Sequence, residues 1–288
     1  MLERADRMLL AVRDRAKAVE TFAGVLDAHP LREAASAHLA ARATVLALGE
    51  SEIELWQPEG KGPVRDFLER WGEGLLAAGY ATGDVGALAA RLAQRGVAPV
   101  REGDRLYVPA EATGGFPMAI SVATPARKAA GAVSFFYEAT HALDADWRPV
   151  AARYADLFAL DASRFSPIES RRFGYEGTLT LFDPPARLDR IELSQTFADQ
   201  PGAMRRFVEK RGGAGLYMCF AEANDFDALK ARLISVGAQF AARAGDIAAE
   251  RDGLWIHPRS LHGMLLGVSR ATFAWTWSGR PELVRPAP

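Results

Sequence analysis

The sequence contains an internal repeat that spans most of the chain. Residues 53–75 read IELWQPEGKGPVRDFLERWGEGL, and residues 191–216 read IELSQTFADQPGAMRRFVEKRGGAGL. Aligning Glu54 with Glu192 gives an offset of 138 residues (192 − 54). A repeat of this length predicts that the two halves of the chain share one fold.

The helices that follow the repeated stretch support this alignment. They read DVGALAARLAQRG from Asp84 and DFDALKARLISVG from Asp225, with an Asp at the N-cap, Leu residues four apart and a closing Gly. Leu88 and Leu229 differ by 141 positions (229 − 88), so only a few residues are inserted between the two points of alignment.

Strand patterns complete the predicted plan. Each half opens with a strand and an amphipathic helix, and residues 42–57 and 177–195 each contain two apolar runs joined by a turn, as in a hairpin. The simplest interpretation is an α+β protein in which four βαβββ modules pair into two domains. We expect residues 1–124 to form the first domain, 132–275 the second and 276–288 a tail, with the small, polar stretch TPARKAAGA as the linker.

Composition narrows the classes of function. The chain has 288 residues, 49% of them hydrophobic and 25% charged, which suits two soluble domains. A net charge of −1 without a basic run gives no reason to expect nucleic acid or a membrane as partner. The N-terminus is too charged for a signal peptide, and no run of about 18 apolar residues occurs. We therefore expect a cytoplasmic protein with a small-molecule ligand.

Several features together resemble a known superfamily. These are the paired modules, the IEL strand followed by FLERWGEGL, and the closing stretch WIHPRSLHGMLLGV at 255–268. They resemble the vicinal oxygen chelate superfamily, which comprises glyoxalases, bleomycin-resistance proteins and extradiol dioxygenases, and the resemblance covers almost the whole chain. It implies two glyoxalase-like domains with curved mixed sheets, each wrapped around a cavity in which His and Glu hold a divalent metal.

Strand alternation predicts which residues line the cavities. Side chains alternate between the faces of a strand, so Glu54 and Trp56 share the face opposite the apolar residues beside them. By the same argument Arg190, Glu192 and Ser194 line the second cavity. The resemblance places a metal-ligating Glu or Gln at Glu54 and Glu192; the alternative is a solvent-exposed carboxylate on an edge strand. The residues expected to contact a ligand are Glu54, Trp56, Arg190, Ser194, Met218 and Gly267.

The other ligand positions that the resemblance implies carry residues unable to bind a divalent cation. They are Arg7, Ala77 and Ala119 in the first domain, and Ala139, Met218 and Gly267 in the second. A catalytic metal site needs about three protein ligands with one position left open. We therefore expect no metal in the first domain.

Two histidines are candidate catalytic or metal-binding residues of the second domain. His141 lies two residues beyond Ala139 and so shares its face, and His262 stands beside the last strand. We expect Glu192 to act with His141 or His262, either as a displaced site for a divalent metal or as a metal-free acid–base pair. The alternative is that both histidines are structural.

Three functions remain compatible with these residues. The first is a lyase or isomerase with a degenerate metal site, acting in the second domain on a small oxygenated carboxylic acid or thioester. The second is a metal-free protein that binds and sequesters a small molecule, as in the bleomycin-resistance branch. The third is a structural role, and a homodimer is compatible with each. We favour the enzyme narrowly over the binding protein.

Overall fold

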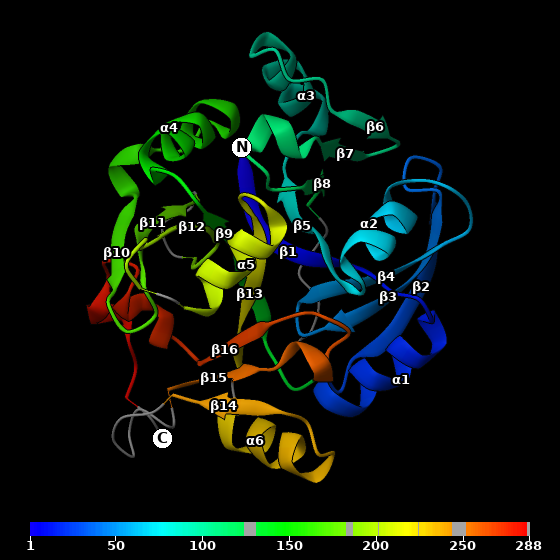
Figure 1. The fold of residues 1–288 in the computed structure, drawn as a ribbon, viewed down its shortest axis with the longest axis vertical. Coiled ribbons are helices and arrows are strands. Elements are labelled where there is room, and N and C mark those ends of the chain that lie inside the picture. The colour runs from blue at the N-terminus through cyan, green and yellow to red at the C-terminus, as the bar shows by residue number, and fades with distance from the viewer. Residues whose placement is uncertain (124–130, 183–186, 201, 224, 244–251, 287–288) are drawn as a thin grey trace.

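The chain folds into two eight-stranded mixed sheets, one in each half, in a computed structural model (Figure 1). The structure describes residues 1–123, 131–182, 187–200, 202–223, 225–243 and 252–286. The first sheet has the strand order β2-β3-β4-β1-β5-β8-β7-β6, and the second has β10-β11-β12-β9-β13-β16-β15-β14. The two orders are the same, which confirms four βαβββ modules.

Each half contains three α-helices and, among its described residues, eight strands; η marks a short 3₁₀ helix. The first half contains β1 (Leu2–Ala11), α1 (Arg15–Leu26), β2 (His29–Ser36), β3 (Ala41–Leu48), β4 (Ser51–Pro58), α2 (Pro63–Trp71), β5 (Gly74–Thr82), α3 (Val85–Gln94), β6 (Val100–Glu102), β7 (Arg105–Val108), η1 (Ala110–Thr113) and β8 (Met118–Val122). The second half contains β9 (Phe135–Leu143), α4 (Trp147–Phe158), η2 (Ala162–Arg164), β10 (Ser166–Ser170), β11 (Tyr175–Leu181), β12 (Arg190–Thr196), α5 (Ala203–Arg211), β13 (Gly215–Ala223), α6 (Phe226–Ser235), β14 (Phe240–Ala242), β15 (Gly253–Ile256), η4 (Pro258–Ser260), β16 (Leu266–Arg270), η5 (Phe273–Thr276) and η6 (Pro281–Leu283).

The repeated helices begin where the sequence predicts. Asp84 and Asp225 are the N-caps of α3 and α6, and each carboxylate accepts a hydrogen bond from the backbone N–H three residues on, at 2.8 Å. These bonds satisfy backbone donors that have no partner within the helix.

Alternation along the central strands gives each sheet two different faces. In β1, Met8 and Leu10 belong to the large core that joins the two halves, whereas Leu9 and Ala11 belong to a separate cluster on the opposite face. We call these the inner face and the cavity face. Helices α1, α3, α4 and α6 contribute to the inner core, while α2 and α5 pack on the cavity faces.

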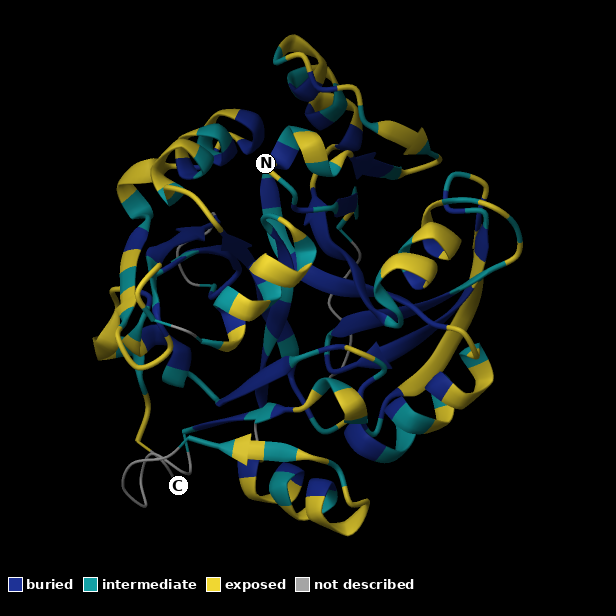
Figure 2. Ribbon diagram, in the orientation of Figure 1, coloured by how far each residue is buried: buried dark blue, intermediate teal, exposed yellow. Residues whose placement is uncertain are grey.

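The inner core is continuous between the halves, and its central strands are buried (Figure 2). Helices from different halves lie side by side at its edges, α1 with α6 and α3 with α4 (Figure 1). Arg232 of α6 pairs with Asp27 at the end of α1 at 3.0 Å, and Arg95 beside α3 pairs with Asp156 of α4 at 2.7 Å. The two halves therefore support each other through their helices as well as their sheets.

Two further findings concern the ends of the domains. Most of the predicted linker, residues 124–130, lies outside the described residues, and the predicted domain boundaries stay a prediction. Phe273–Thr276 form the short helix η5, with Trp275 buried against Tyr137.

Within the described part of the chain, no helix has the length and apolar character needed to cross a membrane.

Candidate ligand-binding site

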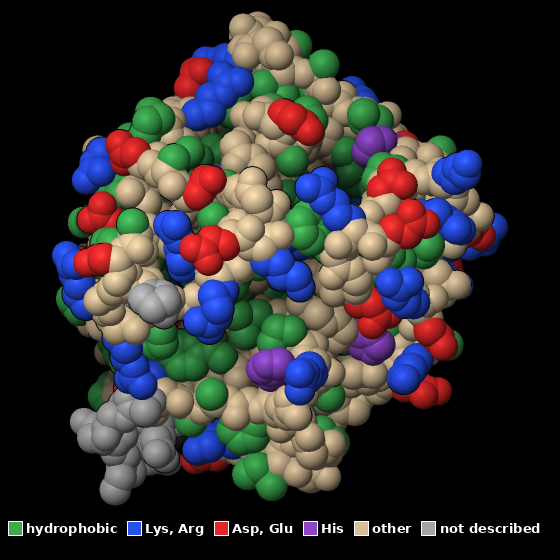
Figure 3. Space-filling view, in the orientation of Figure 1, with side chains coloured by type: hydrophobic (Ala, Val, Ile, Leu, Met, Phe, Trp, Pro, Cys, Tyr) green, Lys and Arg blue, Asp and Glu red, His purple; other side chains and the backbone are tan. Residues whose placement is uncertain are grey.

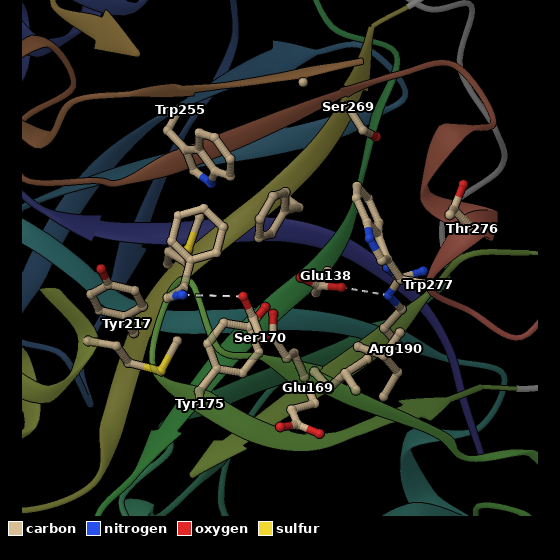
Figure 4. Close-up of a pocket in the computed structure, with 18 of the residues that line it drawn as sticks. Glu138, Glu169, Ser170, Tyr175, Arg190, Tyr217, Trp255, Ser269, Thr276 and Trp277 are labelled. Carbon is tan, nitrogen blue, oxygen red and sulfur yellow. Dashed lines mark hydrogen bonds and ion pairs between the residues drawn. The ribbon is translucent and has the colours of Figure 1, made fainter. Parts of the chain in front are cut away.

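A cavity of about 860 Å³ opens on the cavity face of the second sheet. Figure 3 shows the hollow, lined with hydrophobic side chains and bordered by Lys and Arg side chains. In Figure 4, Tyr175, Tyr217 and Trp255 lie on one side of it, with Trp277 and Arg190 on the other. The aromatic residues of the lining come from five separate segments and are Tyr137, Phe173, Tyr175, Tyr217, Phe220, Trp255 and Trp277.

An ion pair occupies the buried floor of the cavity. Glu138 of β9 and Arg190 of β12 are partners in the parallel ladder, and Arg190 Nε donates to Glu138 Oε2 at 2.6 Å (Figure 4). Arg190 Nη1 also donates to Ser278 Oγ at 2.7 Å, and the guanidinium lies 4.7 Å from the centre of the Tyr137 ring. Both charged side chains are almost completely buried, so each needs the other to offset its loss of hydration.

Glu192 is a second carboxyl group on the same floor, also buried. Its Oε2 accepts a hydrogen bond from Thr140 Oγ1 at 2.9 Å, and its Oε1 accepts one from Ser194 Oγ. Burial and the neighbouring carboxylate of Glu138 raise the pKa of Glu192 well above its usual range, although the two hydroxyl groups oppose this shift. Burial beside Glu138 therefore favours the protonated form of Glu192.

The register of the strands corrects the alignment of the first strands. Arg7 is the ladder partner of Glu52 in the first sheet, and Glu138 is the partner of Arg190 in the second. Because Glu52 and Arg190 are equivalent by the 138-residue offset (190 − 52), the equivalent of Arg7 is Glu138 rather than Ala139. The predicted equivalence of Arg7 and Ala139 was thus wrong by one residue, which is enough to move a side chain to the other face.

His141 consequently lies on the inner face, away from Glu192. Its ladder partner is Leu193, whereas Glu192 pairs with Thr140. The His141 Nε2–H donates to the carbonyl oxygen of Gly114 in the first half at 3.0 Å, and Nδ1 lies 3.0 Å from the Tyr154 hydroxyl. Burial lowers the pKa of His141 to about 3, so the imidazole is neutral and joins the two halves.

His262 also lies away from the cavity. Its Nδ1 is 2.8 Å from Glu73 Oε2 and its Nε2 is 3.0 Å from Thr21 Oγ1, both in the first half. The turn before β16 therefore directs this histidine into the contact between the halves. The predicted set of Glu192, His141 and His262 is not brought together.

The donor set does not fit a divalent metal. No group of three or more His, Cys, Asp or Glu side chains able to hold a metal ion occurs in the part of the chain that the structure describes. On the floor of the cavity Glu138 is already paired with Arg190, and the facing position on the last strand is Gly267. Two carboxyl groups, one of them neutralised by a guanidinium, do not supply the ligands that such a site requires.

The equivalent position of the first sheet is filled by side chains. Glu54 is fully buried, and its carboxylate accepts hydrogen bonds from Arg105 Nη1 at 2.8 Å, Arg105 Nη2 at 2.5 Å and Trp56 Nε1 at 2.9 Å. Trp56 itself packs with the aliphatic side chains on this face. Contrary to the expectation that they contact a ligand, Glu54 and Trp56 are enclosed by the protein's own side chains.

Strand pairing shows why the second sheet differs. Arg105 faces Ser121 in the first sheet and Gly253 faces Ser269 in the second, so Gly253 is the equivalent of Arg105. Ser194 is the equivalent of Trp56 by the 138-residue offset (194 − 56). Two large side chains of the first half are therefore replaced by small ones where the cavity opens.

The remaining predicted residues divide between lining and support. Arg190, Glu192 and Met218 line the cavity, whereas Ser194 is fully buried behind Glu192. Gly267 is the ladder partner of Phe220, and a Cβ atom at this position would lie 2.1 Å from the Phe220 ring. Because Gly267 has no side chain, the ring of Phe220 can occupy this space and form part of the aromatic lining of the cavity.

Sequence reasoning missed several residues of the cavity. Glu138 was overlooked because the register of β9 was misjudged by one position. Tyr175, Tyr217 and Trp255 lie on strands that only the fold brings together. The repeat itself held a signal for the opening, namely the change from Trp56 to Ser194.

Comparisons with known proteins agree with this architecture. The model of the Glyoxalase/Bleomycin resistance protein/Dioxygenase superfamily matches residues 6–113. A triple mutant of 4-hydroxymandelate synthase from Streptomyces coelicolor has a similar structure, with a TM-score of 0.72 and 17% identity over 93% of each chain. A xylose isomerase-like TIM barrel/4-hydroxyphenylpyruvate dioxygenase fusion protein has a TM-score of 0.60 and 13% identity over 94% of this chain and 49% of its own. At these identities the similarity concerns the fold alone.

A single-domain structure covers less of the chain. Methylmalonyl-CoA epimerase from Mycobacterium tuberculosis has a TM-score of 0.40 and 22% identity over 48% of this chain and 89% of its own. No curated protein matches the sequence. The family model supports the predicted resemblance over residues 6–113, and the two structures that match nearly the whole chain share its fold.

Proposed function

We propose that this chain, a tandem protein of the glyoxalase, bleomycin resistance protein and dioxygenase superfamily, binds a small aromatic molecule in the cavity of its second half. One observation carries the proposal. The first half fills its cavity face with Trp56 and Arg105, whereas the second half has Ser194 and Gly253 at these positions and leaves about 860 Å³ of space.

The lining suits a flat, largely apolar ligand. Aromatic side chains from β9, β11, β13, β15 and the C-cap of η5 surround the space, and they offer stacking and edge contacts to a ring. The volume is within the usual range for small-molecule sites, in which a few polar groups fix the orientation of the ligand. Here those groups are on the floor, at Glu138, Arg190 and Glu192.

A binding experiment with a neutral aromatic probe tests this function. We expect 2-naphthamide to bind the purified protein in titration calorimetry, and we expect Trp255→Ala to weaken binding at least about tenfold because a stacking wall is lost. Trp71→Ala, which removes a tryptophan outside the cavity lining, should leave binding unchanged. Binding that survives Trp255→Ala but is lost in Trp71→Ala would place the site elsewhere.

A second candidate is proton transfer by a lyase or isomerase, acting on a small oxygenated carboxylic acid or thioester. The observation that favours it is Glu192, a buried cavity carboxyl group whose pKa is raised by burial and by Glu138. In its ionised form such a group can take a proton from carbon adjacent to a carbonyl and then return one to the resulting enolate, and its raised pKa makes it a stronger base. Aryl-substituted thioesters in D₂O should then incorporate deuterium at that carbon, and Glu192→Gln should stop the exchange; exchange unchanged in the variant would remove this candidate.

A further inference from the structure

We propose that the cavity selects an organic cation, an amidinium or guanidinium group on an aromatic body, and that this group pairs with Glu192 as Arg105 pairs with Glu54. The inference rests on the proposed function, because it names the class of ligand that the same cavity takes. The first half of the molecule supplies the template.

In that template a guanidinium binds a buried carboxylate through two parallel hydrogen bonds. Arg105 Nη1 donates to Glu54 Oε2 at 2.8 Å and Arg105 Nη2 donates to Glu54 Oε1 at 2.5 Å. This bidentate geometry is the strong form of carboxylate recognition, and it is shared by guanidinium and amidinium groups. Arg105 reaches Glu54 from β7, across the cavity face of the sheet.

The second half keeps the carboxyl group and omits the guanidinium. Glu192 is the equivalent of Glu54, and Gly253 on β15 is the equivalent of Arg105 on β7. Both Glu192 and Gly253 line the cavity. Among the described residues no Lys, Arg or His forms an ion pair with Glu192, so the place that a guanidinium occupies in the first half is open to a ligand in the second.

Among the described residues, the groups beside Glu192 give its carboxylate no cationic partner of its own. Glu138 faces it from β9, Arg190 lies on its own strand, and the phenol groups of Tyr175 and Tyr217 face it from β11 and β13. Arg190 is engaged by Glu138, so the floor holds two carboxyl groups and one guanidinium. Without a ligand, burial and the carboxylate of Glu138 raise the pKa of Glu192 and favour its protonated form.

The walls add to the same preference. A cation close to the face of an aromatic ring is attracted by the ring's quadrupole, and the attraction grows when water is excluded. Arg190 already uses Tyr137 in this way, at 4.7 Å from the ring centre. Two arginines of the lining, Arg172 and Arg243, act in the opposite direction. Arg172 lies over Phe173; Arg243 lies over Trp277, with its Cδ 3.9 Å from the position of a Cβ atom at Gly253, and an anionic probe tests their influence.

The pairing predicts that binding releases a proton. A bound amidinium favours the ionised form of Glu192, whereas burial beside Glu138 favours the protonated form in the free protein. Affinity for the cation should therefore rise with pH, by up to about tenfold per pH unit while Glu192 remains protonated in the free protein. Affinity for a neutral probe should not follow this trend.

The experiment compares three isosteric probes on the full chain: 2-naphthamidine, which is cationic, 2-naphthamide, which is neutral, and 2-naphthoate, which is anionic. Titration calorimetry at about pH 6 and about pH 8 should show the amidine binding at least about tenfold more tightly than the amide at the higher pH. Glu192→Gln, which keeps the shape of the side chain, should abolish this preference and its pH dependence while the amide still binds. Glu59→Gln, a change at an exposed residue outside the cavity lining, is the control and should alter neither.

The outcomes separate this inference from the function on which it rests. Equal affinities for the amidine and the amide, or tighter binding of the naphthoate, would overturn the cation preference and leave the aromatic site standing. If none of the three probes binds, both proposals fail. A preference for the amidine that persists in Glu192→Gln would also overturn the inference, because another group would then recognise the cation.

Introducing an arginine at Gly253 provides a second test. Gly253→Arg should place a guanidinium as Arg105 is placed, and the Cβ atom has ordinary contacts, with Val268 O at 3.4 Å and Arg243 Cδ at 3.9 Å. We expect this variant to fold and to lose amidine affinity. Unchanged amidine affinity in a folded Gly253→Arg protein would contradict the equivalence of the two positions.

Discussion

At the scale of single residues, the two buried glutamates of the repeat meet different environments. Glu54 is bound by Arg105 and Trp56 inside a filled face, whereas Glu192 is held by two hydroxyl groups at the edge of a cavity. A buried carboxylate needs a cation or several hydrogen bonds to stabilise its charge. Burial without a cationic partner among the described residues favours the protonated form of Glu192. Two residues of the same type thus have different hydrogen-bond and ion-pair partners because their neighbours differ.

This difference predicts how Glu192→Gln changes stability with pH. The folded-state pKa of Glu192 is raised above its unfolded value, so the wild-type protein loses stability as pH rises from about 4, by at most about 1.4 kcal/mol per pH unit. The neutral variant does not. We expect the melting temperature of Glu192→Gln relative to wild type to increase between about pH 5 and about pH 8, with exposed Glu169→Gln as the control. A difference that is the same at every pH would show that Glu192 is ionised in the folded protein.

At the scale of elements, β4 and β12 pair with β1 and β9 in the same register, but different side chains cover their cavity faces. Both place their glutamates on the cavity face, as alternation in IEL predicts. Long side chains from other strands then close the first face, and small ones leave the second open. The repeated strands set the scaffold, and β7 and β15 decide whether it can hold a ligand.

The filled face gives a prediction for Glu54→Gln. The change leaves the mostly buried guanidinium of Arg105 without its ionic partner, and it should lower the free energy of unfolding by up to about 3 kcal/mol. Affinity for 2-naphthamide should remain that of wild type, because the cavity belongs to the other half. Denaturant unfolding measures the first effect and calorimetry the second.

Glu59→Gln is the matched control for that measurement. It breaks an ion pair with Arg42 in which the two side chains are 55% and 60% exposed, and it should cost less than about 1 kcal/mol. Equal destabilisation by Glu54→Gln and Glu59→Gln would show that the buried ion pair stabilises the fold no more than the exposed ion pair does. Loss of ligand affinity in folded Glu54→Gln would implicate the first half in binding.

The elements also show what the sequence could and could not predict. The repeat, the Asp caps and strand alternation predicted four βαβββ modules and the face on which Glu54 and Glu192 lie. They did not predict which neighbours cover those residues, because Arg105 reaches Glu54 across 51 positions of the chain. The prediction for His141 was wrong for a simpler reason. An error of one residue in the register of a strand places a side chain on the opposite face of the sheet.

At the scale of the whole molecule, the histidines predicted to be catalytic instead join the halves. His141 bonds to Gly114, and His262 lies between Glu73 and Thr21. Main-chain contacts tighten the same boundary at Gly49, which lies against Ser134, and at Gly263, which lies against Glu73. The filled first half therefore acts as a rigid support for the half that contains the cavity.

This contact between the halves predicts an effect of Gly263→Ala. Gly263 has φ +85°, and a Cβ atom there would lie 1.9 Å from the carbonyl oxygen of Glu73. Neither the strain nor the overlap can be relieved without separating the halves, so we expect a fall in melting temperature of several degrees or more. Gly237→Ala has a similar φ of +65° but open space around the Cβ, and should cost only about 1 kcal/mol. Equal losses in the two variants would mean that close contact between the halves contributes nothing.

The central claim is that the second half holds an aromatic ligand where the first half is filled by its own side chains. A crystal structure of the protein with 2-naphthamidine tests it most directly. We predict one probe molecule between Trp255 and Trp277, with its amidinium at Glu192 Oε1 and Oε2 and no probe on the cavity face beside Glu54. A probe bound only outside this cavity, or an amidinium directed away from Glu192, would contradict the account.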